Sequence, residues 1–589
     1  MGFLPTSRKE MLACGYEELD ILLVTGDFYV DHPSYGIAIV GHLLEAEGWR
    51  VGLVFQPDWK DPESLRVMGR PRLGVGITAG NMDSMVDLYT AGRRLRREDA
   101  YSENGIPGKR PPHAASVYAQ LARQAFPKIP VVIGGLEASL RRVVHYDYWQ
   151  DKLRPSILLD SKADILCYGM GEKPMPEIFH RIERGEPLTG IRGTAVLLGK
   201  AASEAFRASG EGVELPSYEE HLRDRQALMR ATKIMEAEMN PFSGQRLIQA
   251  HGDRLLVVEP PPEPLTSAEL DRVYALDYAR APHPSCKGRI PAFETVRDSI
   301  SAVRGCPGGC AFCGLVAHQG RQVMSRSAGS ILSEIAAMTR KPWFRGTVSD
   351  IGGAAGNIYG STNDREFCRR CRRASCLFPA ICPHYHCDGL AARDLLVAAS
   401  KIPGVKHVYI NSGIRLDLAL RQPEYFRELV RNHVSGHMKV APEHLHPEVL
   451  KLMRKNPAEE FYRIRERFEE ESRACGKEQY LIPLFISNFP GCTAERMKVV
   501  DDYLNRNHWS LQQVQDYIPL PMTMGAAMYY CGTDPEGRPI PVNRGLAERR
   551  PQIRVLKKRR SGPDAEPRNR PPRRDGRPRH GNDPRSGRR

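Results

Sequence analysis

Long apolar segments are absent from this sequence of 589 residues. No run of 18 apolar residues exists, so the sequence offers no membrane-spanning helix. The first 20 residues also lack the apolar core of a secretory signal. Fourteen cysteines without an export signal indicate a reducing compartment, in which metal or redox chemistry is commoner than disulfides. We therefore expect a cytoplasmic protein with no membrane partner.

The body of the chain also lacks a charge excess. The formal net charge is +15, but residues 549–589 carry +12 of it and residues 1–548 only +3. The last 41 residues are rich in Arg, Pro and Gly and show no hydrophobic periodicity, which is typical of disorder. We predict a disordered basic tail whose contact with nucleic acid is weak.

Short apolar strand patterns alternate with helical lengths along most of the chain, which indicates an α/β protein. Residues 1–214 predict a doubly wound parallel sheet, with strands at Asp20–Thr25 and Val131–Gly135 among others. A mixed segment with a Pro-rich strip follows, and we interpret residues 215–285 as a connector. The alternation resumes over 286–530 and predicts a partial (β/α) barrel, with chemistry at the carboxyl ends of its strands. Residues 531–589 are a C-terminal extension, basic and disordered from about 549.

Eight of the 14 cysteines lie between Cys306 and Cys387. The first three, Cys306, Cys310 and Cys313, form a C-x3-C-x2-C pattern in a glycine-rich loop directly after a strand pattern. Thiolates at this spacing hold iron–sulfur clusters, and glycines let the backbone wrap closely around the sulfurs. Three thiolates leave one iron of a [4Fe–4S] cluster open, and open coordination marks catalytic metal sites. A zinc loop or an inert cluster is the alternative.

The pattern C-x3-C-x-aromatic-C, with Phe312 as the aromatic residue, resembles the cluster loop of the radical S-adenosylmethionine (SAM) superfamily. Further stretches between about residues 10 and 540 resemble the YgiQ-type members of this superfamily. These stretches include His283–Glu294, Val348–Asn357, Lys439–His444 and Pro483–Thr493. The resemblance implies that Cys306, Cys310 and Cys313 ligate a [4Fe–4S] cluster whose open iron binds SAM. Reductive cleavage of SAM would then start hydrogen abstraction from a substrate that no motif identifies. A reductant such as flavodoxin or ferredoxin is implied as a partner.

The resemblance also places residues around SAM. Gly352 and Gly353 follow a strand pattern and correspond to the superfamily's glycine-rich segment, which contacts the SAM amino group. Ala354–Ala355 stand where that segment usually has an acidic residue. Arg415 and Glu443 would contact polar groups of SAM. A plain turn is the alternative for the glycines, and a salt bridge is the alternative for the two charged residues.

A second cysteine group occupies residues 368–387, an insertion within the predicted barrel. Cys371, Cys376 and Cys382 fall in stretches that resemble the YgiQ-type proteins, and Cys368, Cys387 or a histidine would complete a ligand set. Soft thiolates at short spacing bind zinc or a further iron–sulfur cluster. Free thiols in a loop are the alternative.

The loop after the first predicted strand lies where cobalamin-binding domains carry Asp-x-His-x-x-Gly. Here His32 follows Asp31 directly, so the spacing that orients a histidine toward cobalt is missing. We therefore predict a cobalamin-domain-like fold without cobalamin. We interpret Asp31 and His32 as loop-capping residues, and a place on the substrate side is the alternative.

The sequence thus predicts a cytoplasmic radical SAM enzyme that uses a [4Fe–4S] cluster and SAM. Two alternatives from other classes stay open. A non-catalytic iron–sulfur electron-transfer or sensing protein would not bind SAM and would supply a fourth protein ligand to the cluster. An RNA-binding or RNA-modifying protein would bind RNA through residues 549–589, with a steep dependence on salt.

Overall fold

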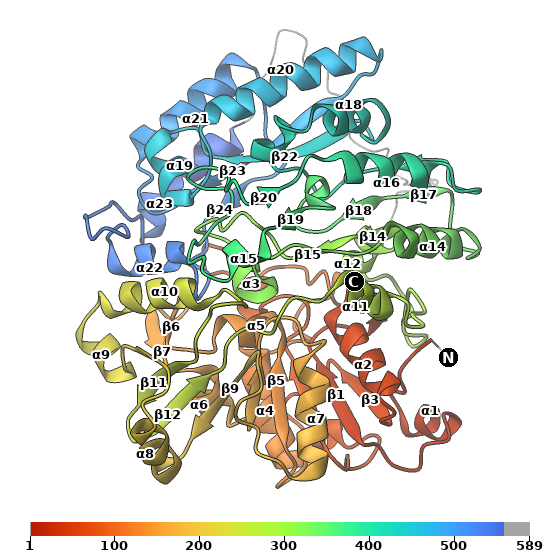
Figure 1. The fold of residues 1–589 in the computed structure, drawn as a ribbon, viewed down its shortest axis with the longest axis vertical. Helices are drawn as coiled ribbons and strands as arrows, with labels where there is room; N and C mark the ends of the chain where they lie inside the picture. Colours follow the sequence, from red (N-terminus) through yellow and green to blue (C-terminus); the bar gives the residue numbers. More distant parts are fainter. Residues whose placement is uncertain (1, 559–589) are drawn as a thin grey trace, which may run out of the picture.

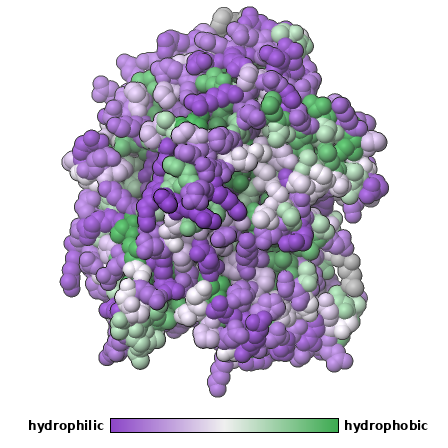
Figure 2. Space-filling model, viewed as in Figure 1, coloured by the Kyte–Doolittle hydropathy of each residue, from purple (hydrophilic) through white to green (hydrophobic). Residues whose placement is uncertain are grey.

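The computed structural model describes residues 2–558. They form an N-terminal half built on a large sheet and a C-terminal half of parallel strands with helices outside them. In Figure 1 the N-terminal half lies at the bottom and the C-terminal half at the top. Hydrophilic residues cover most of the face shown in Figure 2. Within residues 2–558, no helix combines the length and the apolar character needed to cross a membrane.

The N-terminal half contains a nine-stranded sheet with the order β10-β11-β12-β9-β8-β5-β4-β1-β3. Strands β3, β1, β4, β5 and β8 are parallel to one another, whereas β9 pairs with β8 and β12 in antiparallel fashion. The strand bounds are β1 Ile21–Thr25, β3 Val51–Phe55, β4 Gly74–Thr78, β5 Val131–Gly134, β8 Ile165–Cys167, β9 Thr194–Leu198, β10 Val213–Leu215, β11 Leu247–His251 and β12 Arg254–Val258.

Helices cover both faces of this sheet. Ile21 and Leu23 of β1 pack into one core with α2 and α7, and Leu22 and Val24 pack into the opposite core with α4 and α6. Because successive side chains of a strand point to opposite faces, the continuous apolar run of β1 is what a doubly covered strand requires. The helix bounds are α2 Gly36–Ala46, α4 Ala114–Ala125, α5 Gly135–Leu140, α6 Ile157–Ser161, α7 Pro174–Arg184 and α8 Lys200–Ala208.

Residues 215–285, which we expected to be a connector, contribute the edge of this sheet. Strands β11 and β12 form an antiparallel hairpin around Gly252, and β12 pairs with β9. Helices α9 (Tyr218–Arg223) and α10 (Ala227–Glu238) precede the hairpin. The short, alternating pattern of an edge hairpin resembles irregular connector sequence, and only the Pro-rich strip before α11 (Ser267–Tyr274) leaves the sheet.

The C-terminal half is a partial (β/α) barrel around one hydrophobic core. The pairs β14–β18, β17–β21, β22–β23 and β23–β24 are all parallel, and Ile414 forms a parallel bridge with Val440. The strand bounds are β14 Ser299–Ser301, β15 Val303–Arg304, β17 Thr347–Val348, β18 Asp350–Gly352, β21 His407–Val408, β22 His437–Glu443, β23 Tyr480–Ser487 and β24 Gln515–Asp516. The helix bounds are α13 Leu315–Gln319, α14 Ala328–Thr339, α16 Leu390–Ser400, α18 Pro423–Asn432, α20 Ala458–Ala474, α21 Ala494–Arg506 and α22 Met524–Cys531.

Helix α23 (Leu546–Lys557) extends into the segment for which we predicted disorder. Arg549, Gln552 and Leu556 are buried on one face of it, and Arg549 pairs with Asp516 at 2.8 Å. The predicted start of disorder at about 549 is therefore too early, because the high Arg content concealed a short amphipathic pattern. The remainder of the predicted tail, residues 559–589, lies outside the described residues.

Candidate functional site

The predicted cluster loop connects β15 to α13, at the end of the first barrel strands. Its path is fixed by backbone hydrogen bonds: the Cys306 N–H donates to the Gly320 carbonyl and the Cys313 N–H to the Cys310 carbonyl, both at 3.1 Å. The structure thus places all three cysteines on one short turn between a strand and a helix.

Gly309 shows why this loop is rich in glycine. Its φ is +61°, and a Cβ there would lie 2.2 Å from the carbonyl oxygen of Ala374. A side chain is therefore excluded both by the backbone conformation and by the close approach of the second cysteine segment.

The three thiols lie close enough to influence one another's ionisation. Cys313 is the most exposed of the three. Burial, followed by the charge of Cys310, nevertheless raises the pKa of its thiol to about 12. Burial also raises the pKa of Cys306, while Arg415 acts in the opposite direction. These thiols would bind iron as thiolates and release their protons on binding. The donor set therefore fits an iron–sulfur cluster.

Arg415 lies against the cluster loop. Its Nη1 is 3.6 Å from the Cys310 Sγ, and its guanidinium forms a buried ion pair with Asp417. The backbone of Arg415 is fixed by Asn357, whose Oδ1 accepts the Arg415 N–H at 2.8 Å. A Cβ on Gly308 would lie 2.5 Å from Nη1. This cation is therefore in contact with a predicted cluster ligand.

Glu443 ends strand β22 in a left-handed conformation, with φ +67°. Burial raises the pKa of its carboxyl to about 7, and the charge of Glu443 in turn raises the pKa of Cys313. Its Oε2 is buried without a hydrogen-bond partner, and Lys455 lies 3.9 Å from Oε1. A strained, buried acceptor beside the cluster loop is available to a ligand.

Gly352 and Gly353 lie where β18 ends, beside β15. A Cβ on Gly353 would be 2.5 Å from the carbonyl oxygen of Val303, and a Cβ on Gly352 would be 2.5 Å from Ser412 Oγ. Ser412 Oγ is itself buried without a hydrogen-bond partner. Close packing against backbone requires glycine at 353, whereas at 352 the contact is with a side chain that can rotate. Contact of either glycine with SAM stays a prediction.

A cavity of about 590 Å³ separates the N-terminal sheet from the barrel. Its floor is formed by the loops after β1, β4, β5 and β8, including Gly80, Gly135 and Gly171. Its roof includes Val303, next to the cluster loop, and Gly353. Ligands of parallel α/β sheets bind at this carboxyl edge. The cavity thus connects that edge with the surroundings of the cluster loop.

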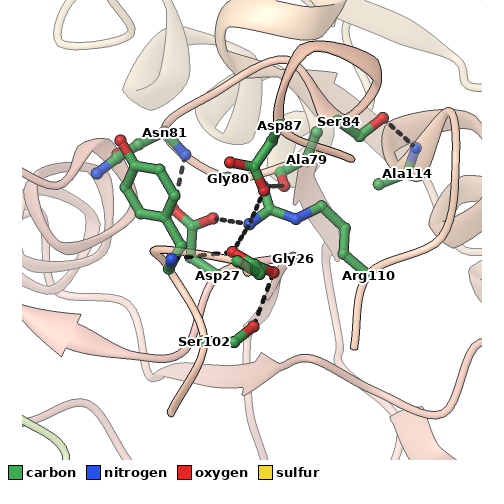
Figure 3. Close-up of polar contacts among 12 residues, drawn as sticks. Gly26, Asp27, Ala79, Gly80, Asn81, Ser84, Asp87, Ser102, Arg110 and Ala114 are labelled. Carbon is green, nitrogen blue, oxygen red and sulfur yellow. Dashed lines mark hydrogen bonds and ion pairs between the residues drawn. The ribbon is translucent and has the colours of Figure 1, made fainter. Parts of the chain in front are cut away.

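A buried cluster of carboxylates around Arg110 borders the cavity through Asp27 (Figure 3). Sequence reasoning did not find this cluster. The Arg110 Nη2 lies 3.0 Å from Asp27, 3.2 Å from Asp87 and 3.4 Å from Asp99. Burial raises the pKa of Asp27 to about 6 and that of Asp87 to about 7. Only Asp27, directly after the first strand, carried a sequence signal, because the other partners are scattered along the chain.

His32 is buried outside this cavity. Its Nδ1 accepts a hydrogen bond from the Ser34 N–H at 3.1 Å, and the carboxylate of Asp31 contacts His42 at 2.7 Å. Both residues therefore hold the loop in place, as expected from the sequence.

The second cysteine group packs against the cluster loop. The Cys376 N–H donates to the Pro307 carbonyl at 2.9 Å, and the Cys382 N–H donates to the Cys376 carbonyl at 2.7 Å. Cys371 lies at the start of the same segment and is partly exposed. Across residues 2–558, no three Cys, His, Asp or Glu side chains already converge as ligands of a metal ion.

Comparisons with solved structures found two enzymes of low sequence identity. The methyltransferase TsrM from Kitasatospora setae, with cobalamin and a [4Fe–4S] cluster bound, is 16% identical at a TM-score of 0.49 and covers 86% of this chain and 77% of its own. The cobalamin-dependent SAM radical enzyme OxsB, with aqua-cobalamin and SAM bound, is 11% identical at a TM-score of 0.47 and covers 89% and 56%.

The prediction that cobalamin is absent does not stand. That prediction rested on the histidine spacing alone, and both solved structures contain cobalamin. The spacing tests for one axial cobalt ligand, whereas the cavity at the sheet edge is a separate property of the fold. The missing motif therefore does not exclude the cofactor.

Comparisons with known sequences identify the family. The family model for the radical SAM N-terminal domain matches residues 3–299. A UPF0313 protein of Geobacter sulfurreducens is 47% identical over 94% of this chain and 92% of its own length. A UPF0313 protein of Vibrio vulnificus is 44% identical over 93% and 79%. The chain therefore belongs to the UPF0313 family, the YgiQ-type proteins of the radical SAM superfamily.

Proposed function

We propose that this protein is a radical SAM enzyme in which Cys306, Cys310 and Cys313 hold a [4Fe–4S] cluster that binds SAM. When bound, such a cluster supplies the electron that cleaves SAM to methionine and a 5′-deoxyadenosyl radical, which abstracts a substrate hydrogen atom. Membership of the superfamily supports this activity.

The convergence of groups at the cluster loop carries the proposal. Three thiols meet a buried guanidinium at Cys310 and the charge of a buried carboxyl with an unpartnered oxygen. Val303 and Leu315, which flank the cluster loop, line the cavity. An electron-transfer protein with a closed cluster has no need of such an unsatisfied acceptor, because burying one is costly.

Each residue has a distinct task in this scheme. Arg415 would compensate the negative charge of the thiolates, since its guanidinium already contacts Cys310. Glu443 Oε2 would accept a hydrogen bond from the amino group of SAM. Gly353 keeps the wall between cluster loop and cavity thin enough for close approach. A one-electron donor such as flavodoxin or ferredoxin would reduce the cluster in the cytoplasm.

Electron paramagnetic resonance tests the cluster assignment. After anaerobic reconstitution and reduction, the wild-type protein should give a [4Fe–4S]⁺ signal that changes when SAM is added. Cys306→Ala should lose the signal that responds to SAM, and Cys14→Ala, far along the chain, should keep it. A wild-type signal that is indifferent to SAM would favour the alternative of an electron-transfer or sensing protein.

A second candidate concerns the cavity. We propose that it accommodates cobalamin as a further cofactor, because the glycine-lined edge of the sheet faces 590 Å³ of space next to the cluster loop. Gly36 lines this cavity, and a Cβ there would meet nothing within 4 Å. Filling the space from Gly36 should therefore block the ligand without disturbing the fold.

Absorbance spectroscopy after incubation with aquacobalamin tests this candidate. Wild-type protein should retain about one cobalamin per chain through gel filtration, and Gly36→Trp should retain almost none. Gly199→Trp is the matched control, because Gly199 is equally open but lies outside the cavity. Equal retention by both variants, or none by the wild type, would refute cobalamin binding while leaving the cluster proposal intact.

A further inference from the structure

Four of the five cysteines of residues 368–387 lie in one environment and the fifth, Cys387, lies in another. The Cys382 N–H donates to the Cys376 carbonyl at 2.7 Å, and the charges of Cys368, Cys371 and Cys382 all act on the Cys376 thiol. The Cys371 N–H also donates to the Cys368 carbonyl at 3.2 Å. Four thiols of this segment therefore share one small region.

Cys387 belongs to a different environment. Its Sγ donates to the Asn357 carbonyl at 3.4 Å and accepts from the Gln422 Nε2 at 3.2 Å. The histidines of the segment are also directed elsewhere. His384 stacks on Phe367 with ring centroids 3.7 Å apart. His386 is exposed on strand β20 (Tyr385–His386).

A buried cation without a carboxylate lies beside the four thiols. Arg321 is 6% exposed, its Nε has no hydrogen-bond partner, and residues 2–558 provide it with no salt bridge. Its charge lowers the pKa of Cys376 and of Cys368, against the larger opposite effect of burial. Gln322, 8% exposed, has an Nε2 without a full hydrogen-bond partner, and the side chain acts as a weak donor toward the Cys368 thiol. Burying such donors is costly unless an anion satisfies them.

We propose that Cys368, Cys371, Cys376 and Cys382 bind a metal centre through four thiolates, either a zinc ion or a second iron–sulfur cluster. Four thiolates around a divalent zinc ion carry a net charge of −2, and thiolate-bound iron–sulfur clusters are likewise anionic. Such a centre would provide a negatively charged partner for the Arg321 guanidinium and an acceptor for the Gln322 amide. Binding would turn the four thiols toward one another and release their protons.

The position of this centre gives it a structural task. Asn240, just beyond α10, donates from Nδ2 to the Cys368 carbonyl at 2.6 Å and to the Cys371 carbonyl at 2.8 Å. On the other side, Ser375 Oγ donates to the Gly308 carbonyl at 2.5 Å. The centre would therefore fix the N-terminal half of the protein to the cluster loop.

Metal and sulfide analysis of a triple variant isolates this centre from the first cluster. The full chain carrying Cys306→Ala, Cys310→Ala and Cys313→Ala, purified anaerobically, should retain either about one zinc per chain or iron and sulfide in roughly equal amounts. Adding Cys376→Ser should lower the metal content per chain at least tenfold, and adding Cys387→Ser should leave that content unchanged. Zinc without sulfide, or iron with sulfide, decides between the two kinds of centre.

Alkylation mapping keeps the test decisive if Cys376→Ser fails to fold. In the triple variant, iodoacetamide should label the four cysteines much more slowly than Cys387 until a chelator is added. Metal below about a tenth of an equivalent per chain, or loss of metal with Cys387→Ser but not with Cys376→Ser, would overturn the proposal. Labelling of the four cysteines that a chelator does not accelerate would overturn it as well.

Discussion

At the scale of single residues, Asp27, Asp87 and Asp99 share one guanidinium, that of Arg110. Three carboxylates cannot all be ionised beside one buried cation without a large electrostatic cost. The raised pKa values of Asp27 and Asp87, about 6 and about 7, follow from that burial. Burial thus favours the protonated forms of Asp27, at the edge of the cavity, and of Asp87 behind it.

We predict that Asp27→Asn flattens the pH dependence of stability. The pKa of Asp27 rises from 3.8 to about 6 on folding, so its contribution is fully present below about pH 4 and is lost as the pH rises through 6. The loss is on the order of 1–3 kcal/mol. Thermal unfolding between pH 4.5 and 7.5 measures it. Asp253→Asn, at an exposed position, is the control. Parallel profiles for wild type and Asp27→Asn would contradict the prediction.

Arg415 supports a second prediction at this scale. Burial opposes the ionisation of Asp417, but Arg415 outweighs it and holds the pKa of that carboxyl below its usual value. Arg415→Gln should therefore disturb the charge around Cys310 and reduce SAM cleavage about tenfold, a change of about 1.4 kcal/mol in barrier. Arg415→Lys should retain more activity, and Arg421→Gln, on an exposed arginine, should retain all of it. Full activity and iron content in Arg415→Gln would show that the cation is dispensable.

At the scale of elements, the cluster loop and the second cysteine segment act as one packed unit. Gly309→Ala should cause loss of iron from the first cluster, because its Cβ would be forced to within 2.2 Å of the Ala374 carbonyl oxygen. Gly185→Ala is a matched control, since Gly185, at the end of α7, also has a positive φ but would meet nothing within 4 Å. The control should therefore carry only the backbone cost of about 1 kcal/mol. Equal iron content in the two variants would contradict this packing.

Helix α23 permits a truncation experiment. Ending the chain after Lys558 removes only residues outside the described part, and the melting temperature should stay unchanged. Ending it after Gly545 also removes Arg549 and Leu556, which are buried against the barrel, and should lower the melting temperature by several degrees. If the tail contacts nucleic acid, the shorter deletion alone should abolish a salt-dependent affinity for RNA. Equal melting of both truncations would contradict the packing of α23.

The same elements show how far the sequence could predict the fold. The strand patterns at Asp20–Thr25 and Val131–Gly135 matched β1 and β5, because strands buried on both faces are uniformly apolar. The edge hairpin β11–β12 and helix α23 were missed, because half-exposed elements have mixed composition. The cysteine loop was evident from spacing, whereas Arg110 and its partners meet only through tertiary contacts.

At the scale of the whole molecule, the sheet edge, the cavity and the cluster loop form one continuous region between the two halves. The nearly neutral body of the chain surrounds this region, and most of the net charge lies in the last 41 residues. The basic tail therefore has little bearing on the chemistry proposed for the interior.

Release of 5′-deoxyadenosine tests the central claim most directly. The full chain, reconstituted anaerobically with iron and sulfide, is given SAM and a strong reductant, and the products are separated by chromatography. We predict 5′-deoxyadenosine from the wild type and from Cys387→Ser, and none from Cys306→Ala, Cys310→Ala or Cys313→Ala. A wild-type protein that holds its cluster and yet releases no 5′-deoxyadenosine would contradict the account.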